Sequence, residues 1–284
     1  MRDRLLIGPV LVLAVIGLVW LEDRFGGTAF PPGTLMGAVV ALLVWLGAGE
    51  LGAMARAKGT LVSDLHLRMC ALLGAAISMV DPAAMDARSS AGAVSAGACV
   101  VLVGSMVLYA RRKSPPGVMA FVGTSLLSFA YLGLMFGYVF AVRREYSAWV
   151  LLWVVLTTKA CDTGAYFTGR AIGKHKLIPW LSPGKTWEGL AGGAIWAAAV
   201  ASGGLWMLRR FTGSAPLEPL EGSAFGVAAA IFGQAGDLMA SFMKRDAGLK
   251  DSGKSIPGMG GILDVIDSPL LVMPVAYWWM RLAS

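Results

Sequence analysis

The feature that most constrains the fold is a succession of apolar runs, each about as long as a membrane-spanning helix. About 20 apolar residues in a helix cross the hydrocarbon core of a bilayer. Of the 284 residues, 57% are hydrophobic and only 14% are charged, a balance outside the range of soluble globular domains. We therefore predict an all-α, polytopic integral membrane helical bundle.

About nine transmembrane helices are predicted. They lie near Leu5–Leu21, Thr34–Met54, Leu67–Val80, Ala91–Ala110, Val118–Val142, Ala148–Phe167, Gly189–Leu208, Ser223–Met243 and Ser268–Leu282. Residues 1–142 are expected to form an N-terminal transmembrane scaffold, and residues 143–284 a C-terminal transmembrane catalytic region, within one integral domain. With the N-terminus inside, Lys and Arg are concentrated in the cytoplasmic loops. We therefore expect a multi-pass protein of the cell membrane, inner or plasma, with its active site facing the cytoplasm.

Most of the polar residues of this oily chain lie in one stretch, Gly233–Ser268. Gln234, Asp237, Ser241 and Lys244 follow one another at spacings of three, four and three, which places them on one face of a helix. An ionised acid inside a membrane span costs about 2.5 to 3.5 kcal/mol on insertion scales, so it normally faces a cation, a cavity or a partner. We expect Asp237 to have such a companion, and the basic residues that follow it offer several.

The loop after this helix combines cations, carboxylates and glycines. They are Lys244, Arg245, Lys250 and Lys254; Asp246, Asp251, Asp264 and Asp267; and Gly253, Gly258, Gly260 and Gly261. Glycines let backbone N–H groups approach an anion, basic side chains neutralise phosphate charge, and carboxylates suit Mg²⁺. The combination favours phosphoryl or nucleotidyl transfer, and its alternative is a solvated charged loop between two spans.

Residues Gly248–Ser255 also match the P-loop pattern G-x-x-x-x-G-K-[ST]. A P-loop follows a buried strand and opens a helix at its Lys-Ser. Here a predicted membrane helix precedes the pattern, and a Pro-Gly-Met-Gly-Gly run follows, which cannot continue a helix. We therefore predict that this segment is not a P-loop.

A second polar cluster begins in the sixth predicted span. Lys159 and Asp162 are three residues apart and can pair on one helix face, which offsets the cost of burying each. The following loop contains Ser182-Pro-Gly-Lys185-Thr-Trp-Glu-Gly189. This loop is either a cradle for a triphosphate or a basic loop that only obeys the topology rule.

The two polar clusters together resemble the phosphatidate cytidylyltransferases, also called CDP-diacylglycerol synthases. The signature of that family resembles Ser241–Gly253, Pro257–Gly261 and Leu263–Asp267, and its other motif resembles Asp162-Thr-Gly-Ala-Tyr with the Ser182–Gly189 run. The resemblance covers Asp162 to Asp267, and the first five spans match only in hydropathy. Two positions depart from the family pattern, which has His where this chain has Met259 and Arg where it has Val265.

The resemblance implies that the chain transfers cytidylyl from CTP to phosphatidic acid, giving CDP-diacylglycerol and pyrophosphate for phospholipid biosynthesis. On this basis we assign Mg²⁺ as the cofactor, with Asp237 and Asp264 as its ligands. The expected catalytic residues are Asp237, Lys244, Arg245, Asp251, Asp264 and Asp267. The expected residues for substrate and phosphate binding are Ser182, Lys185, Ser241, Lys250, Gly253, Gly260 and Gly261.

The sequence leaves two other functions open. A CTP-dependent kinase for a polyprenol or phytol-like alcohol would release CDP, and a transporter or channel would show flux without CTP turnover. The expected partners are CTP, phosphatidic acid and membrane lipids, with a homodimer as a candidate assembly. The net charge of +7 is spread over loops, so nucleic acid is not an expected partner. Glu50, near the end of the second span, is expected to pair with a basic group.

Overall fold

The computed structural model describes residues 2–27, 31, 33–79, 87–258 and 260–283. The chain divides into two compact units. The first unit contains Met1–Met36, Val142–Phe242 and Val265–Ser284, and the second contains Gly37–Ala141 and Met243–Asp264. Helices α9 and α10 each carry residues of both units, as their bounds below show.

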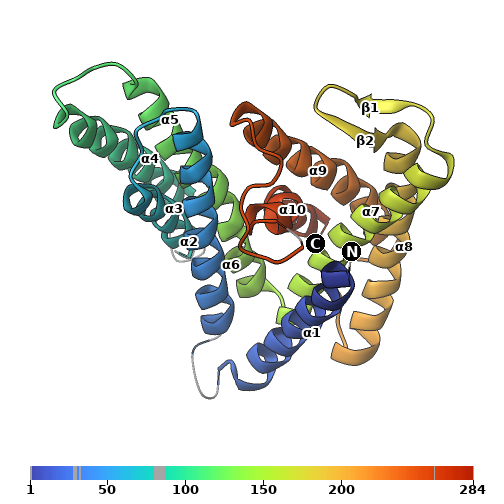
Figure 1. Ribbon diagram of the computed structural model, residues 1–284. Coiled ribbons are helices and arrows are strands. Elements are labelled where there is room, and N and C mark those ends of the chain that lie inside the picture. The colour runs from blue at the N-terminus through green and yellow to red at the C-terminus, as the bar shows by residue number, and fades with distance from the viewer. Residues whose placement is uncertain (1, 28–30, 32, 80–86, 259, 284) are drawn as a thin grey trace. The chain divides into compact units, whose positions relative to one another are not determined.

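The first unit consists of helices and one short hairpin (Figure 1). Its elements are α1 (Arg2–Phe25), α7 (Ala148–Ile172), β1 (Lys176–Ile178), β2 (Ser182–Thr186), α8 (Trp187–Thr212), most of α9 (Pro219–Asp246) and most of α10 (Leu263–Ala283). The strands β1 and β2 are antiparallel, and Ile178 pairs with Ser182. The Ser182–Gly189 run, expected to be a loop, therefore forms a strand followed by the start of a helix.

The second unit consists mainly of helices, three of which, at Val118–Glu145, follow one another without a break. Its elements are most of α2 (Thr34–Ala57), α3 (Asp64–Met79), α4 (Ala87–Ala110), α5 (Val118–Leu127), the π-helix η1 (Ser128–Met135) and most of α6 (Phe136–Glu145). Helices α3 and η1 pack through glycines, because a Cβ at Gly74 would collide with the carbonyl of Phe129. Small residues permit this close approach of helix backbones in a membrane.

The all-α membrane class is confirmed. Five described helices are long and apolar enough to span a membrane: Thr34–Ala57, Ala91–Ala110, Val118–Glu145, Trp187–Thr212 and Pro219–Asp246. They coincide with five of the predicted spans. Helices α1, α3, α7 and α10 lie at the other four positions, with Val80 outside the described residues, so the number of crossings stays a prediction.

Local sequence explains how the hairpin joins α8. Thr186 is the N-cap residue of α8, and its side chain accepts a hydrogen bond from the backbone N–H of Gly189 at 3.1 Å. Glu188 accepts hydrogen bonds from the backbone N–H of His175 and contacts Nδ1 of the same residue at 2.6 Å. These contacts fix the position of Lys185, the residue before the cap.

Candidate active site

Asp237, on α9 of the first unit, forms an ion pair with Lys185. The distance from Lys185 Nζ to Asp237 Oδ2 is 2.7 Å, and the exposed fractions of the two side chains are 17% and 33%. The sequence predicted that Asp237 needs a companion but pointed to the loop after α9 as its source. The structure identifies Lys185 of β2, so the Ser182–Gly189 motif meets the α9 stripe inside one unit.

Three more charged residues of the first unit lie around this pair. Lys159 and Asp162 of α7 form the predicted i, i+3 ion pair, with Nζ 3.0 Å from Oδ2. Lys159 also interacts electrostatically with Asp237 and Asp267. The first unit thus gathers three carboxylates and two ammonium groups, an arrangement with nearly balanced charge.

Glycines allow α9 to approach α10 at this point. A Cβ on Gly236 would lie 2.5 Å from the backbone carbonyl oxygen of Asp267, and one on Gly233 would touch Thr158 and Ser268 at 3.5 to 3.7 Å. Any side chain at Gly236 would therefore push the two helices apart. Asp267 itself is buried, and its Oδ1 accepts the backbone N–H of Ser268 at 2.6 Å.

In the second unit, the loop between α9 and α10 has a defined structure. Gly248 adopts φ +70°, the backbone N–H of Leu249 donates to the carbonyl of Lys244 at 2.8 Å, and α9 ends there. Ile256 and Gly260 then form an antiparallel bridge through two backbone hydrogen bonds. A helix, α9, precedes Gly248–Ser255 where a P-loop has a strand, and no helix opens at Lys254-Ser255, which confirms that the segment is not a P-loop.

Asp264, in the first turn of α10 and ahead of the predicted span, organises this loop. Its Oδ1 accepts from Lys244 Nζ at 2.6 Å, and its Oδ2 accepts from the backbone N–H groups of Ser252 at 2.8 Å and Gly261 at 2.9 Å. Burial by itself would raise the pKa of Asp264, but the bonds from Lys244 and the two N–H groups outweigh it and lower that pKa. The carboxylate is therefore ionised at neutral pH.

Glu50 is a second residue whose partners differ from those predicted from the sequence. It was expected to pair with a basic group, but among the described residues its partners are hydroxyl and backbone donors of the loop and of the start of α10. The residue is 8% exposed. An acid at the end of a predicted span was the available signal, and its partners could not be read from the pattern.

The other predicted residues fall into two groups. Ser182, Ser241 and Gly253 are half-buried, and Arg245, Lys250 and Asp251 are exposed. Asp237, Lys185, Ser182, Ser241 and Asp267 belong to the first unit, and the remaining predicted site residues belong to the second. Of the two departures from the family pattern, Val265 is half-buried in the first turn of α10, and Met259 lies outside the described residues.

The carboxylates differ in what they offer a metal ion. The described residues contain no group of three or more His, Cys, Asp or Glu that could hold a metal by themselves. Asp237 offers an oxygen, Oδ1, beside the one paired with Lys185, whereas both oxygens of Asp264 accept hydrogen bonds. A Mg²⁺ ion held by one carboxylate and substrate phosphate oxygens fits Asp237.

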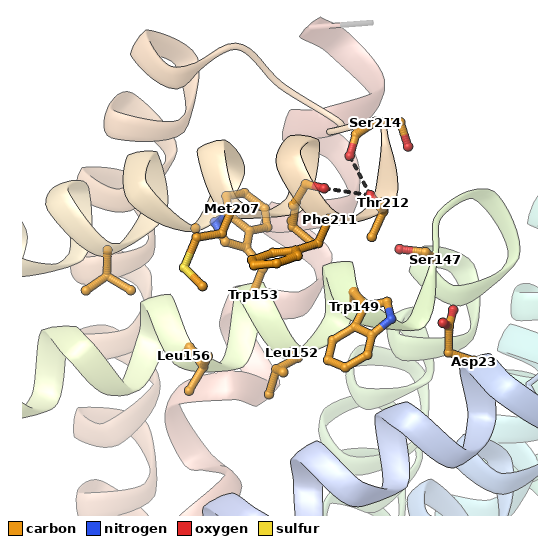
Figure 2. A pocket seen from close by; sticks show the side chains of 13 residues that line it. Asp23, Ser147, Trp149, Leu152, Trp153, Leu156, Met207, Phe211, Thr212 and Ser214 are labelled. Carbon is orange, nitrogen blue, oxygen red and sulfur yellow. Dashed lines mark hydrogen bonds between the residues drawn. The ribbon is translucent and has the colours of Figure 1, made fainter.

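The first unit also has a groove of about 800 Å³ between α7 and α8. Figure 2 shows Trp149, Trp153 and Phe211 among its lining residues, together with Ser147 and Thr212. Its walls are mainly apolar, and none of the predicted site residues lines it. The groove therefore contributes no group to the chemistry above.

The fold and these charged clusters define a helical membrane protein with paired acidic and basic groups. Comparison with known sequences identifies its family. A profile of the cytidylyltransferase family matches residues 2–283. The chain belongs to the cytidylyltransferase family, which confirms the resemblance drawn from the motifs.

Several relatives carry the name phosphatidate cytidylyltransferase. One from Bacillus subtilis is 37% identical over 165 residues, which are 57% of this chain and 60% of that protein. One from Staphylococcus saprophyticus is 40% identical over 159 residues, 53% of this chain and 55% of its own length. One from Haemophilus influenzae is 42% identical over 128 residues, 44% of this chain and 43% of its own length. The similarity to these relatives thus spans 60% of their length or less.

Proposed function

We propose that this chain is a phosphatidate cytidylyltransferase, which transfers cytidylyl from CTP to phosphatidic acid. Family membership and the names of three relatives support the proposal. The observation that carries it is the Lys185–Asp237 contact at 2.7 Å. It joins the Ser182–Gly189 motif to the polar stripe of α9, which leads into the signature that begins at Ser241.

The reaction consists of one displacement at phosphorus. A phosphate oxygen of phosphatidic acid forms a bond to the α-phosphorus of CTP, and the bond from that phosphorus to the bridging oxygen breaks, so that pyrophosphate leaves with the electron pair. The lipid phosphate is already ionised near pH 7 and needs no base. Catalysis then depends on positioning and on neutralising phosphate charge.

The basic side chains of the proposed site differ in burial and in partners. Lys185 is placed beside Asp237 and buried enough for its charge to act strongly on a phosphate. Lys244 lies in the second unit with a side chain 11% exposed, bound to Asp264. Arg245 and Lys250 are exposed and would meet a nucleotide arriving from water.

We propose Mg²⁺ as the cofactor, with Asp237 and Asp264 as candidate ligands. Bound Mg²⁺ supplies charge neutralisation on phosphate oxygens. Asp237 fits a ligand as it stands. Asp264 fits only if Lys244 leaves its Oδ1, because its two oxygens already accept the bonds that shape the loop.

The proposed setting is the cell membrane, with the motifs on the cytoplasmic side, where CTP is found. Five apolar helices support the membrane setting, and the distribution of Lys and Arg supports the orientation. Phosphatidic acid would present its headgroup at the interface while its acyl chains stay in the bilayer. A homodimer remains a candidate assembly, to be tested by light scattering of the purified protein.

The purified protein should release pyrophosphate from CTP when phosphatidic acid is supplied in mixed micelles with Mg²⁺. Diacylglycerol or a polyprenol in place of phosphatidic acid should give no pyrophosphate. Release of CDP with an alcohol acceptor, and no pyrophosphate with phosphatidic acid, would establish a lipid kinase instead. Solute flux in liposomes without CTP turnover would establish a transporter.

A further inference from the structure

Glu50 holds the loop between α9 and α10 from outside the motif. Its Oε1 accepts from Ser255 Oγ at 2.6 Å and from the backbone N–H of Ile262 at 2.8 Å. Its Oε2 accepts from Ser252 Oγ and from the backbone N–H of Leu263, both at 2.9 Å. Both carboxylate oxygens are therefore fully engaged, and all the partners belong to the second unit.

These contacts give a buried carboxylate four donors, and no Lys or Arg of the described residues forms an ion pair with it. Ile262 and Leu263 lie at the start of α10, where the helix leaves backbone N–H groups without partners inside the helix and the dipole favours an anion. Hydrogen bonds to an ionised acceptor are roughly twice as strong as neutral ones. Glu50 therefore ties α2 to the start of α10 through charge-assisted bonds.

The loop is shaped to receive this carboxylate. A Cβ on Gly253 would lie 2.8 Å from Glu50 Oε1, and one on Gly261 would collide with Glu50 and with Ser252 Oγ. Ser252 Oγ also lies 2.9 Å from Asp264 Oδ2. The single hydroxyl hydrogen of Ser252 thus serves two carboxylates, which links the Glu50 anchor to the Lys244–Asp264 pair.

We infer that Glu50 is a positioning residue that aligns the phosphate-binding loop for turnover. It touches no reacting atom, because its oxygens are taken by the loop itself. Its effect passes through Ser252 and Asp264 to Lys244, whose ammonium group is 2.6 Å from Asp264. The effect of Glu50 on turnover rests on the proposed function, because it assumes the reaction that Lys244 serves. The anchoring of the loop by Glu50 does not depend on that function.

The test uses the full-length protein in detergent and compares Glu50→Gln with Glu50→Asp. The amide of Gln has one acceptor oxygen, so its NH₂ group faces backbone donors and leaves at least one buried N–H unpaired. We expect Glu50→Gln to lower kcat roughly tenfold to a hundredfold with a smaller change in KM for CTP, since small misplacements away from the chemistry cost this much. Glu50→Asp, which keeps the charge, should recover part of the loss.

Hydrogen exchange supplies the second measurement. Glu50→Gln should lower the protection of the amides of Ile262 and Leu263, with global unfolding little changed. Glu218→Gln is the control, because Glu218 forms an exposed pair with Arg209 and lies in the first unit; it should leave kcat and the loop unaltered.

Unchanged kcat or unchanged loop protection in Glu50→Gln would overturn the inference. If that variant does not fold, Ser255→Ala takes its place, because it removes one donor to Glu50. We expect Ser255→Ala to lower both kcat and the hydrogen-exchange protection of the loop. Values equal to those of the wild type for both quantities would also overturn the inference. A wild type without CTP turnover would refute the proposed function, and the exchange measurement would still decide whether Glu50 anchors the loop.

Discussion

Lys185 Nζ lies 2.7 Å from Asp237 Oδ2, so that a strand of the hairpin and a membrane helix share one ion pair. Both side chains are partly buried, which separates this contact from the exposed pairs that contribute little. The pair therefore connects the Ser182–Gly189 motif to the polar stripe of α9, which leads into the signature that begins at Ser241. It can be tested by exchanging the charges.

The double variant Lys185→Asp with Asp237→Lys should restore folding without restoring activity. The exchanged pair keeps the attraction, but places a carboxylate where the proposal needs a cation for phosphate. We expect thermal unfolding closer to that of the wild type than in either single variant, with pyrophosphate release still reduced at least about a hundredfold, on the scale of losing a key electrostatic stabiliser. Recovery of activity together with stability would show that the pair is only structural.

Asp237→Asn should reduce turnover at least about a hundredfold, because it removes the carboxylate proposed to hold Mg²⁺ while keeping the side-chain volume. Asp246→Asn is the matched control on the same helix, since Asp246 forms an exposed pair with Lys58. Pyrophosphate release should be followed across a Mg²⁺ titration. Near-normal activity of Asp237→Asn at saturating Mg²⁺ would contradict the metal assignment.

Gly236→Ala should destabilise the first unit. Its Cβ would lie 2.5 Å from the carbonyl oxygen of Asp267, and backbone atoms cannot move aside without separating α9 from α10. Overpacking of this kind costs about 1 to 3 kcal/mol, and we expect a lower Tm. Gly203→Ala on α8 is the control, because no neighbouring element of the described structure comes within 4 Å of the position that its Cβ would take. Equal Tm values for the two variants would refute the close-contact argument.

Asp264→Asn should lower the Tm by a similar amount from pH 5 to pH 8. The pKa of Asp264 is lowered in the folded protein, so the stability that its charge provides is present above the ordinary carboxyl pKa of about 3.9 and is lost only as the pH falls through the lowered value. The wild type therefore keeps this contribution throughout the range. A gap that closes as the pH falls from 8 to 5 would show that Asp264 titrates there instead.

The membrane fold could be predicted because each apolar run must satisfy its own backbone hydrogen bonds as a helix, whatever surrounds it. The Lys159–Asp162 pair could also be predicted, because residues three apart on a helix are neighbours. The motifs at Ser182–Gly189 and Ser241–Asp267 identified the family. All of these depend on short stretches of sequence.

The partners of the buried carboxylates were decided by the tertiary structure. The segment that carries Lys185 was expected to be a loop, but it forms an antiparallel hairpin that ends at the Thr186 cap. This arrangement places Lys185 beside Asp237 of α9. Glu50 binds a loop more than 200 residues away in the chain. Periodicity reports which face of a helix is polar, but the donors that meet that face come from elements whose approach depends on packing, and here glycines such as Gly261 make room for it. The sequence by itself therefore determined the helices, the family, the chemical types at the motifs and the Lys159–Asp162 pair within one helix, and the tertiary structure determined which distant groups meet Asp237 and Glu50.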